Sequence, residues 1–117
     1  MRGLACLRRL CLALPEAEER TTWDHQTFRV RDKIFAMFVT RHGEAAGLWC
    51  KAPKGVQELL IAADGEKFFR PPYVGPKGWI GVRLDAATDW AEIDALVRRS
   101  WRMTAPKRLA ATLPDLG

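Results

Sequence analysis

Two stretches of the chain repeat apolar residues every three or four positions, the spacing that gives a helix one buried face. The first covers residues 3–13, and Pro15 is expected to end it. The second begins after Asp89, which with Glu92 three residues later resembles a capping arrangement. The buried face of this second helix should contain Trp90, Ile93, Leu96, Val97 and Trp101.

Between these helices the period changes to two, which is typical of strands. Phe28 and Val30 alternate with polar residues and predict a half-buried strand, and a turn at residues 32–33 leads into the apolar stretch 34–39. We expect 34–39 to be a central strand buried on both faces, although this short apolar run is also compatible with a helix. The segment between the first helix and these strands is expected to be an acidic connector, with Glu16, Glu18 and Glu19.

The second half of the chain mixes extended, helical and irregular patterns. A loop at 42–47 precedes a strand at 48–51, and Pro53 is expected to open a helix with Val56, Leu59, Leu60 and Ala63 on its apolar side. Residues 70–78 are too rich in proline and glycine for regular structure. A strand then carries Ile80, Val82 and Leu84 on one face, and a short last helix follows Pro106.

This order of elements predicts an α+β fold in which an antiparallel sheet is packed by about four helices. The length of 117 residues suits one domain, 1–117, and is too short for two independent cores. Hydrophobic residues make up 48% of the chain and charged residues 28%, a balance that excludes wholesale disorder.

The N-terminus begins like a signal peptide, but Arg8 and Arg9 interrupt its apolar part and Pro15-Glu16 replaces a small-residue cleavage site. No apolar run reaches the roughly 18 residues of a membrane helix, so we expect a cytoplasmic protein without membrane contact. The three cysteines, an odd number without a Cys-x-x-Cys pair, are expected to be free thiols.

The positive charge is concentrated near the C-terminus. The net charge is +5 overall, yet residues 1–97 hold 14 basic and 13 acidic side chains. The excess comes from Arg98, Arg99, Arg102, Lys107 and Arg108. Clustered guanidinium groups of this kind suit phosphate recognition. The alternative is a solvated helix face whose positive charges interact favourably with the helix C-terminus.

A second basic group, Arg29, Arg31 and Lys33, is spaced by two residues and would share one face of a strand. This face could follow a phosphate backbone, or it could be the ordinary wet side of an antiparallel sheet. Among the five tryptophans, Trp49 has a basic neighbour on its own strand face, Lys51, and is a weak candidate for stacking on bases.

Catalytic patterns are missing from the sequence. The glycine-containing segment 75–78 lacks the spacing of a phosphate-binding loop, and Asp24-His25 has no nucleophile that the sequence places beside it. We therefore expect a protein that is not an enzyme and that uses no cofactor or metal.

Nine short segments follow one another along the chain in a specific order: residues 11–16, 27–30, 33–37, 48–53, 69–75, 78–82, 89–90, 100–101 and 105–109. Together they resemble the MmcQ/YjbR family of small bacterial proteins, and the resemblance covers residues 4 to about 111. It implies an α+β fold related to a double-wing DNA-binding domain, and family members are usually described as DNA-binding. The family has no agreed catalytic residues to carry over.

Two functions follow as hypotheses. The first is binding of duplex DNA mainly through its phosphates, with little sequence readout, by the two basic groups; Arg98, Arg99, Arg102, Lys107 and Arg108 would be the principal patch. The alternative is a protein-interaction or small-ligand module without a nucleic-acid role. Its groove would be formed by Arg70, Pro72, Tyr73, Lys77 and Trp79. The oligomeric state is open.

Overall fold

The computed structural model describes residues 2–40 and 46–113 of the chain. The helices are α1 (Arg2–Leu12), α2 (Val56–Ala63), α3 (Trp90–Thr104) and α4 (Lys107–Ala110), with a short 3₁₀ helix, η1 (Gly75–Lys77). The strands are β1 (Ala17–Thr22), β2 (His25–Val30), β3 (Lys33–Val39), β4 (Gly47–Cys50), β5 (Phe68–Phe69) and β6 (Ile80–Arg83). Most of the loop expected at 42–47 lies outside the described residues.

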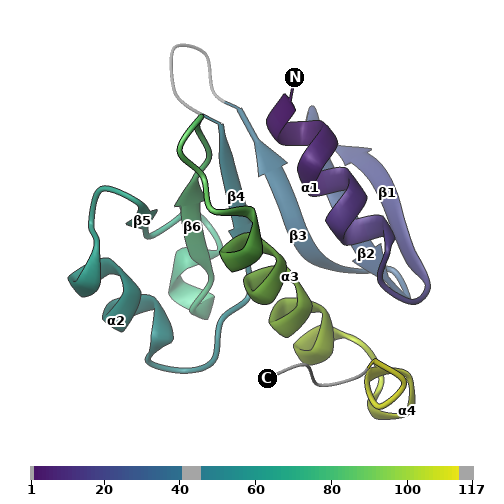
Figure 1. Cartoon of the computed structure of the whole chain (residues 1–117). Coiled ribbons are helices and arrows are strands. Elements are labelled where there is room, and N and C mark those ends of the chain that lie inside the picture. Colours follow the sequence, from purple (N-terminus) through teal and green to yellow (C-terminus); the bar gives the residue numbers. More distant parts are fainter. Residues whose placement is uncertain (1, 41–45, 114–117) are drawn as a thin grey trace.

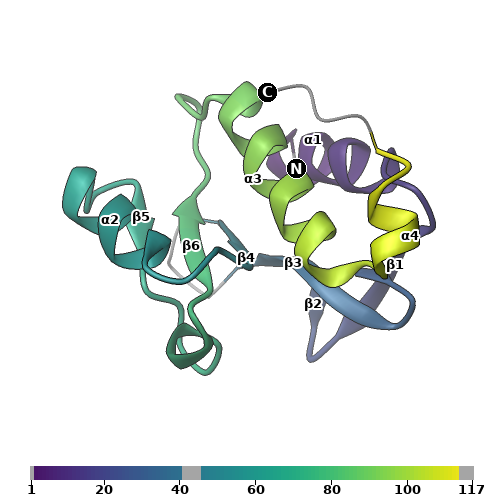
Figure 2. The same ribbon diagram turned by 90° about the horizontal axis from the view of Figure 1, so that it is seen from below.

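The six strands form one antiparallel sheet in the order β1-β2-β3-β4-β6-β5. Helices α1 and α3 run across one face of this sheet (Figure 1). Figure 2 shows α4 on the same side and the segment with η1 on the opposite side. We call the face away from α1 and α3 the open face. The predicted α+β class, an antiparallel sheet packed by four helices, is confirmed for the described residues.

The sheet separates two apolar clusters. The main core lies between the sheet and α1 and α3, and Phe28, Phe35 and Trp101 are completely buried in it. A smaller cluster lies on the open face and consists of Met37, Val39, Trp49 and Trp79, with Ile34, Phe69 and Val74 packed against it. Strand β3 is therefore buried on both faces from Phe35 to Val39, as its sequence predicts.

The interpretation of residues 16–19 as a connector is wrong, because most of that segment belongs to strand β1. Strand β1 pairs along its whole length with β2, and no other strand of the described part of the chain pairs with it. An edge strand needs little apolar surface, and charged side chains protect it from pairing with other chains. Glu19 points toward α1, where Arg8 Nε binds its carboxylate at 2.6 Å. The acidic composition of this segment did not indicate a strand, because β1 is held by backbone hydrogen bonds to β2.

Helix α2 also differs from the prediction. It begins at Val56 instead of near Pro53, after Gly55 in a left-handed conformation (φ 86°) that a side chain rarely adopts. Leu59, predicted on the apolar side, is 69% exposed, whereas Gln57 is buried. The reason is that Gln57 finds two backbone partners, one in the first residue of η1 and one just after η1, which makes a polar residue suitable for the inner side of this helix.

Gly81 in β6 allows the ring of Phe69 to lie against the open face. A Cβ at Gly81 would lie 2.4 Å from that ring. We expect Gly81→Ala to lower the free energy of unfolding by about 1–3 kcal/mol, because the ring must move from a packed position. Urea denaturation followed by circular dichroism measures this. Gly65→Ala, where the nearest atom is 3.4 Å away, is the control, and equal losses in both variants would contradict the explanation.

Candidate ligand-binding face

The principal basic patch of the sequence prediction lies on the helical side of the molecule, in α3 and α4. Arg98 Nε binds both carboxylate oxygens of Asp94, one helical turn earlier, at 3.1 Å. The Nε and Nη2 atoms of Arg99 are enclosed by protein and make no hydrogen bond to any described residue. Arg102 is half-buried, whereas Lys107 and Arg108 are exposed. The patch thus includes one arginine paired within its own helix and one whose guanidinium is largely enclosed.

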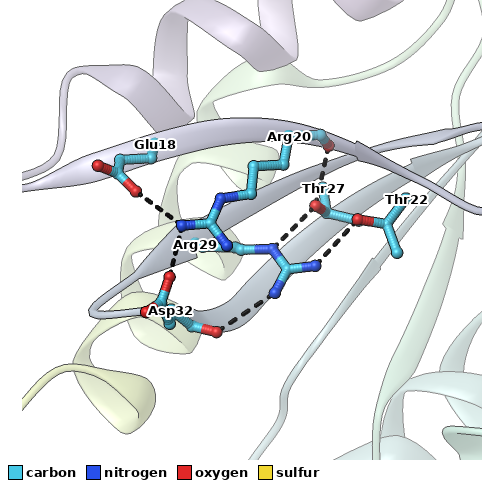
Figure 3. A network of polar contacts seen from close by, with 6 residues as sticks. All are labelled: Glu18, Arg20, Thr22, Thr27, Arg29 and Asp32. Carbon is cyan, nitrogen blue, oxygen red and sulfur yellow. Dashed lines mark hydrogen bonds and ion pairs between the residues drawn. The ribbon is translucent and has the colours of Figure 1, made fainter.

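Arg29, from the second basic group, lies in a polar network on the open face (Figure 3). Its guanidinium donates to the hydroxyls of Thr22 at 2.9 Å and Thr27 at 3.3 Å, and to the backbone oxygen of Asp32 at 3.3 Å. Arg20, beside it, donates to the carboxylate of Asp32. The donors of Arg29 are therefore engaged inside the β1–β2–β3 region.

Arg31 and Lys33 differ in their surroundings. Arg31 lies in the left-handed turn between β2 and β3 (φ 49°), where Glu16 binds it with two hydrogen bonds of 2.5 and 3.0 Å. These bonds raise the pKa of Arg31 and lower the pKa of Glu16. Lys33, the first residue of β3, is exposed and takes part in none of the ion pairs between described residues. The prediction that Arg29, Arg31 and Lys33 share one strand face is wrong. Arg31 lies in the turn, and Lys33 is the register partner of Val30, whose side chain is in the main core on the other face from Arg29.

Lys33 instead belongs to a cluster of three lysines, with Lys51 and Lys77, that the sequence does not place together. Strands β3, β4 and β6 are antiparallel neighbours, so the start of β3, the end of β4 and the start of β6 share one end of the sheet. Lys33 begins β3, Lys51 follows β4 and Lys77 ends η1, three residues before β6. Partial burial lowers the pKa of Lys51, and the charges of Lys33 and Lys77 lower it further. No ion pair between described residues involves this lysine cluster.

A pocket of about 510 Å³ lies beside the lysine cluster on the open face, within the range of roughly 300–1,000 Å³ that is typical of small-molecule sites. We call it the aromatic pocket; it is lined by Trp23, His25, Met37, Trp49, Tyr73, Val74 and Lys77. Met37 and Trp49 are register partners on β3 and β4 and form its floor. Lys77 belongs both to the pocket and to the lysine cluster, so the apolar and the cationic surfaces are continuous.

The two most exposed aromatic side chains of the described residues stand at this pocket. Trp23 is 76% exposed and lies in the two-residue turn between β1 and β2. Tyr73 is 88% exposed and lies in the proline-rich segment before η1. Of the residues of the alternative groove, Tyr73 and Lys77 line this pocket. Trp79 is only 7% exposed and packs below it, and Arg70 packs against Gly75, where a Cβ would lie 2.7 Å from its Cγ.

Buried Gln57 of α2 holds the segment that carries Tyr73 and Lys77. Its amide nitrogen donates to the backbone oxygen of Gly75 at 2.9 Å and to that of Trp79 at 2.5 Å. One side chain therefore ties both ends of η1 to the helix. Gln57, Trp23 and His25 were not predicted as site residues; a polar residue beside an apolar helix stripe was the available signal for Gln57.

The thiols lie away from the open face. All three cysteines are free, and Cys11 and Cys50 are buried in the main core. Burial raises the pKa of Cys50 to about 12 and raises that of Cys11 as well, which keeps both thiols protonated and unreactive. Within residues 2–40 and 46–113, no three His, Cys, Asp or Glu side chains gather as metal ligands, and no helix has the length and apolar character to cross a membrane.

Comparisons with known proteins agree with this fold. A crystal structure of the Deinococcus radiodurans protein DR2400, with a DUF419 domain, superimposes with a TM-score of 0.75 at 22% sequence identity, over 86% of this chain and 77% of that one. At this identity the likeness shows a shared fold. No curated protein matches the sequence. The model of the YjbR family matches residues 12–103, which is most of the chain, and the protein therefore belongs to the YjbR family.

Proposed function

We propose that this protein binds nucleic acid through the open face of its sheet and catalyses no reaction on it. The lysine cluster would contact phosphates, and the aromatic pocket would contact bases. The observation that carries this proposal is that Lys77 lines the aromatic pocket and also lies beside Lys51. A ligand that joins a planar apolar part to negative charges fits both surfaces at once, and a nucleotide chain has this composition.

The physical basis is the same as in other proteins that bind nucleic acid without reading sequence. Each lysine that neutralises a phosphate releases condensed counterions, which supplies affinity that falls with salt. Aromatic side chains add stacking, which is tolerant of sequence because every base has a flat face. We expect little base-specific readout, since phosphate and stacking contacts carry no hydrogen-bond code.

The helical side is the competing surface, as the sequence predicts with Arg98, Arg99, Arg102, Lys107 and Arg108. Lys107 and Arg108, like the lysine cluster, make no ion pair among the described residues, whereas Arg98 is paired with Asp94. The open face is favoured because cations adjoin exposed aromatic rings there. Helices α3 and α4 lie on the opposite side of the sheet from the segment with η1 (Figure 2), so variants can separate the two surfaces.

Charge-matched variants test which surface binds. Lys33→Gln/Lys77→Gln removes two exposed cations from the lysine cluster at the end of the sheet, and Lys107→Gln/Arg108→Gln removes two from α4 on the helical side. Fluorescence anisotropy of a labelled oligonucleotide, single-stranded and duplex, would be measured at salt concentrations from about 50 to 200 mM. We expect the first variant to bind about tenfold more weakly, with a salt slope shallower by roughly one to two, because two phosphate contacts are lost.

The helical-side variant should bind within about twofold of the unchanged protein, although its net charge changes equally. The reverse result would place the phosphate contacts on α3 and α4. If the unchanged protein binds neither oligonucleotide at low salt, the proposed function is wrong, and the aromatic pocket would then suit the alternative of a small ligand.

A further inference from the structure

Trp23 and Tyr73 share a backbone property that sets them apart from the other aromatic residues of the described chain. Both have a left-handed backbone, with φ 52° at Trp23 and φ 63° at Tyr73. At Tyr73 the chain makes a three-residue turn, closed by Val74 N–H donating to the oxygen of Pro72 at 2.6 Å. Such turns with positive φ at the centre are rare and strained. Glycine, asparagine and aspartate usually occupy left-handed positions, and bulky residues are outliers there.

Aromatic residues at these two positions are unfavourable for a second reason, because both rings are exposed to solvent. Trp23 is 76% exposed and Tyr73 88% exposed, so neither ring contributes much apolar burial to the folded state. Asparagine at either position would remove the exposed ring and would adopt the left-handed backbone conformation more readily. Strained residues persist where the strain serves a site, and both of these flank one pocket although fifty positions separate them in sequence.

We propose that the aromatic pocket receives an unpaired base, which contacts the rings of Trp23 and Tyr73, so that the protein binds single-stranded nucleic acid in preference to duplex. This inference rests on the proposed function and names the form of nucleic acid that the open face selects. Phosphates next to the bound base would lie toward Lys77 and the rest of the lysine cluster.

The preference for a single strand follows from what the pocket offers. It presents ring faces and an apolar floor of Met37 and Trp49, and these surfaces contact the flat face of a base. In a duplex both faces of every base are covered by its neighbours, so a base can enter only if it is extruded from the stack. Extrusion costs a few kcal/mol. A single strand offers bases that separate from their neighbours more easily.

Three labelled oligonucleotides of equal length test this inference: a thymidine single strand, a mixed-sequence duplex, and a single strand in which abasic residues replace the nucleotides. The abasic strand keeps the phosphates and removes the bases. We expect the thymidine strand to bind at least about tenfold more tightly than either of the others. Binding of the thymidine strand should also quench tryptophan fluorescence, and Trp23→Phe should reduce that quenching.

The variant Trp23→Asn/Tyr73→Asn separates a binding role from a structural one. We expect its affinity for the thymidine strand to fall at least about tenfold, while its melting temperature stays the same or rises, because asparagine tolerates the left-handed backbone. Leu59→Ala, which trims an exposed apolar residue of α2 outside the pocket, is the control and should leave affinity unchanged.

The possible outcomes distinguish the two proposals. Equal affinity for thymidine, duplex and abasic strands would overturn the base-binding inference while leaving phosphate binding intact. A double variant that binds normally would overturn it too, as would one that melts well below the unchanged protein. Failure to bind any of the three oligonucleotides would contradict the proposed function itself.

Discussion

Trp101→Ala should lower the free energy of unfolding by about 3–5 kcal/mol. The side chain is completely buried in the main core between the sheet and the helices, and removal of the indole leaves a cavity that the neighbours fill only in part. The variant also loses the hydrogen bond from Trp101 Nε1 to the backbone oxygen of Pro15, 3.1 Å long, which ties α3 to the link between α1 and β1. Domains of this size are stable by about 5–15 kcal/mol, so a large share of the stability is lost.

Urea denaturation followed by far-ultraviolet circular dichroism measures this loss. Trp101→Phe keeps an aromatic ring in the core and should retain most of the stability that alanine removes. Met103→Ala, in the same helix but 45% exposed, should change the free energy by less than about 1 kcal/mol. A loss for Trp101→Ala no larger than that for Met103→Ala would show that the indole does not organise the core.

Gln57→Leu should lower the free energy of unfolding by about 2–5 kcal/mol, because two buried backbone oxygens lose their donor. Leucine has a similar volume, so the effect reports the lost hydrogen bonds to Gly75 and Trp79 more than a cavity. Since these bonds tie η1 to α2, the positions of Tyr73 and Lys77 should loosen as well. Under the proposed function, affinity for nucleic acid should fall by about tenfold even where the variant is fully folded.

Glu58→Leu is the control for this prediction, because Glu58 is the next residue of α2 and is exposed. It should keep both stability and affinity close to those of the unchanged protein. Stability and affinity are separate readouts here. A stable Gln57→Leu variant would contradict the role of the two hydrogen bonds, and a destabilised variant with unchanged affinity would show that the aromatic pocket does not need a fixed η1.

The elements that sequence patterns predicted correctly are those whose apolar residues recur at a regular spacing and so mark a buried face. Helices α1 and α3 bury residues at helical spacing, and α3 starts at Asp89, whose side chain accepts from the backbone of Ala91 and Glu92. Strands β2, β3, β4 and β6 carry apolar residues that the core requires. Strand β1 was missed because it lies at the sheet edge and is held by pairing with β2, which leaves no hydrophobic alternation to recognise.

The count of charged residues located the basic excess along the sequence. It did not show which of these cations are already paired with acidic side chains in the folded chain. The ion pair of Arg98 with Asp94, four residues apart, was within reach of a sequence argument, since such pairs meet on a helix. The pair of Arg31 with Glu16 was not, because fifteen residues and a strand pairing separate them. Whether a cation can meet an external phosphate depends on such partners.

Local patterns along the chain were thus sufficient for the α+β class and the buried faces of α3 and β3, because periodicity depends on neighbours a few residues away. The family resemblance, now shown over residues 12–103, predicted the same α+β class. The candidate site arises only in the folded chain. Trp23 and Tyr73 meet at one pocket, and Lys33, Lys51 and Lys77 meet at one sheet end. The order of antiparallel strands and the anchoring of η1 by Gln57 bring these residues together, and both are contacts between distant segments that no local spacing encodes.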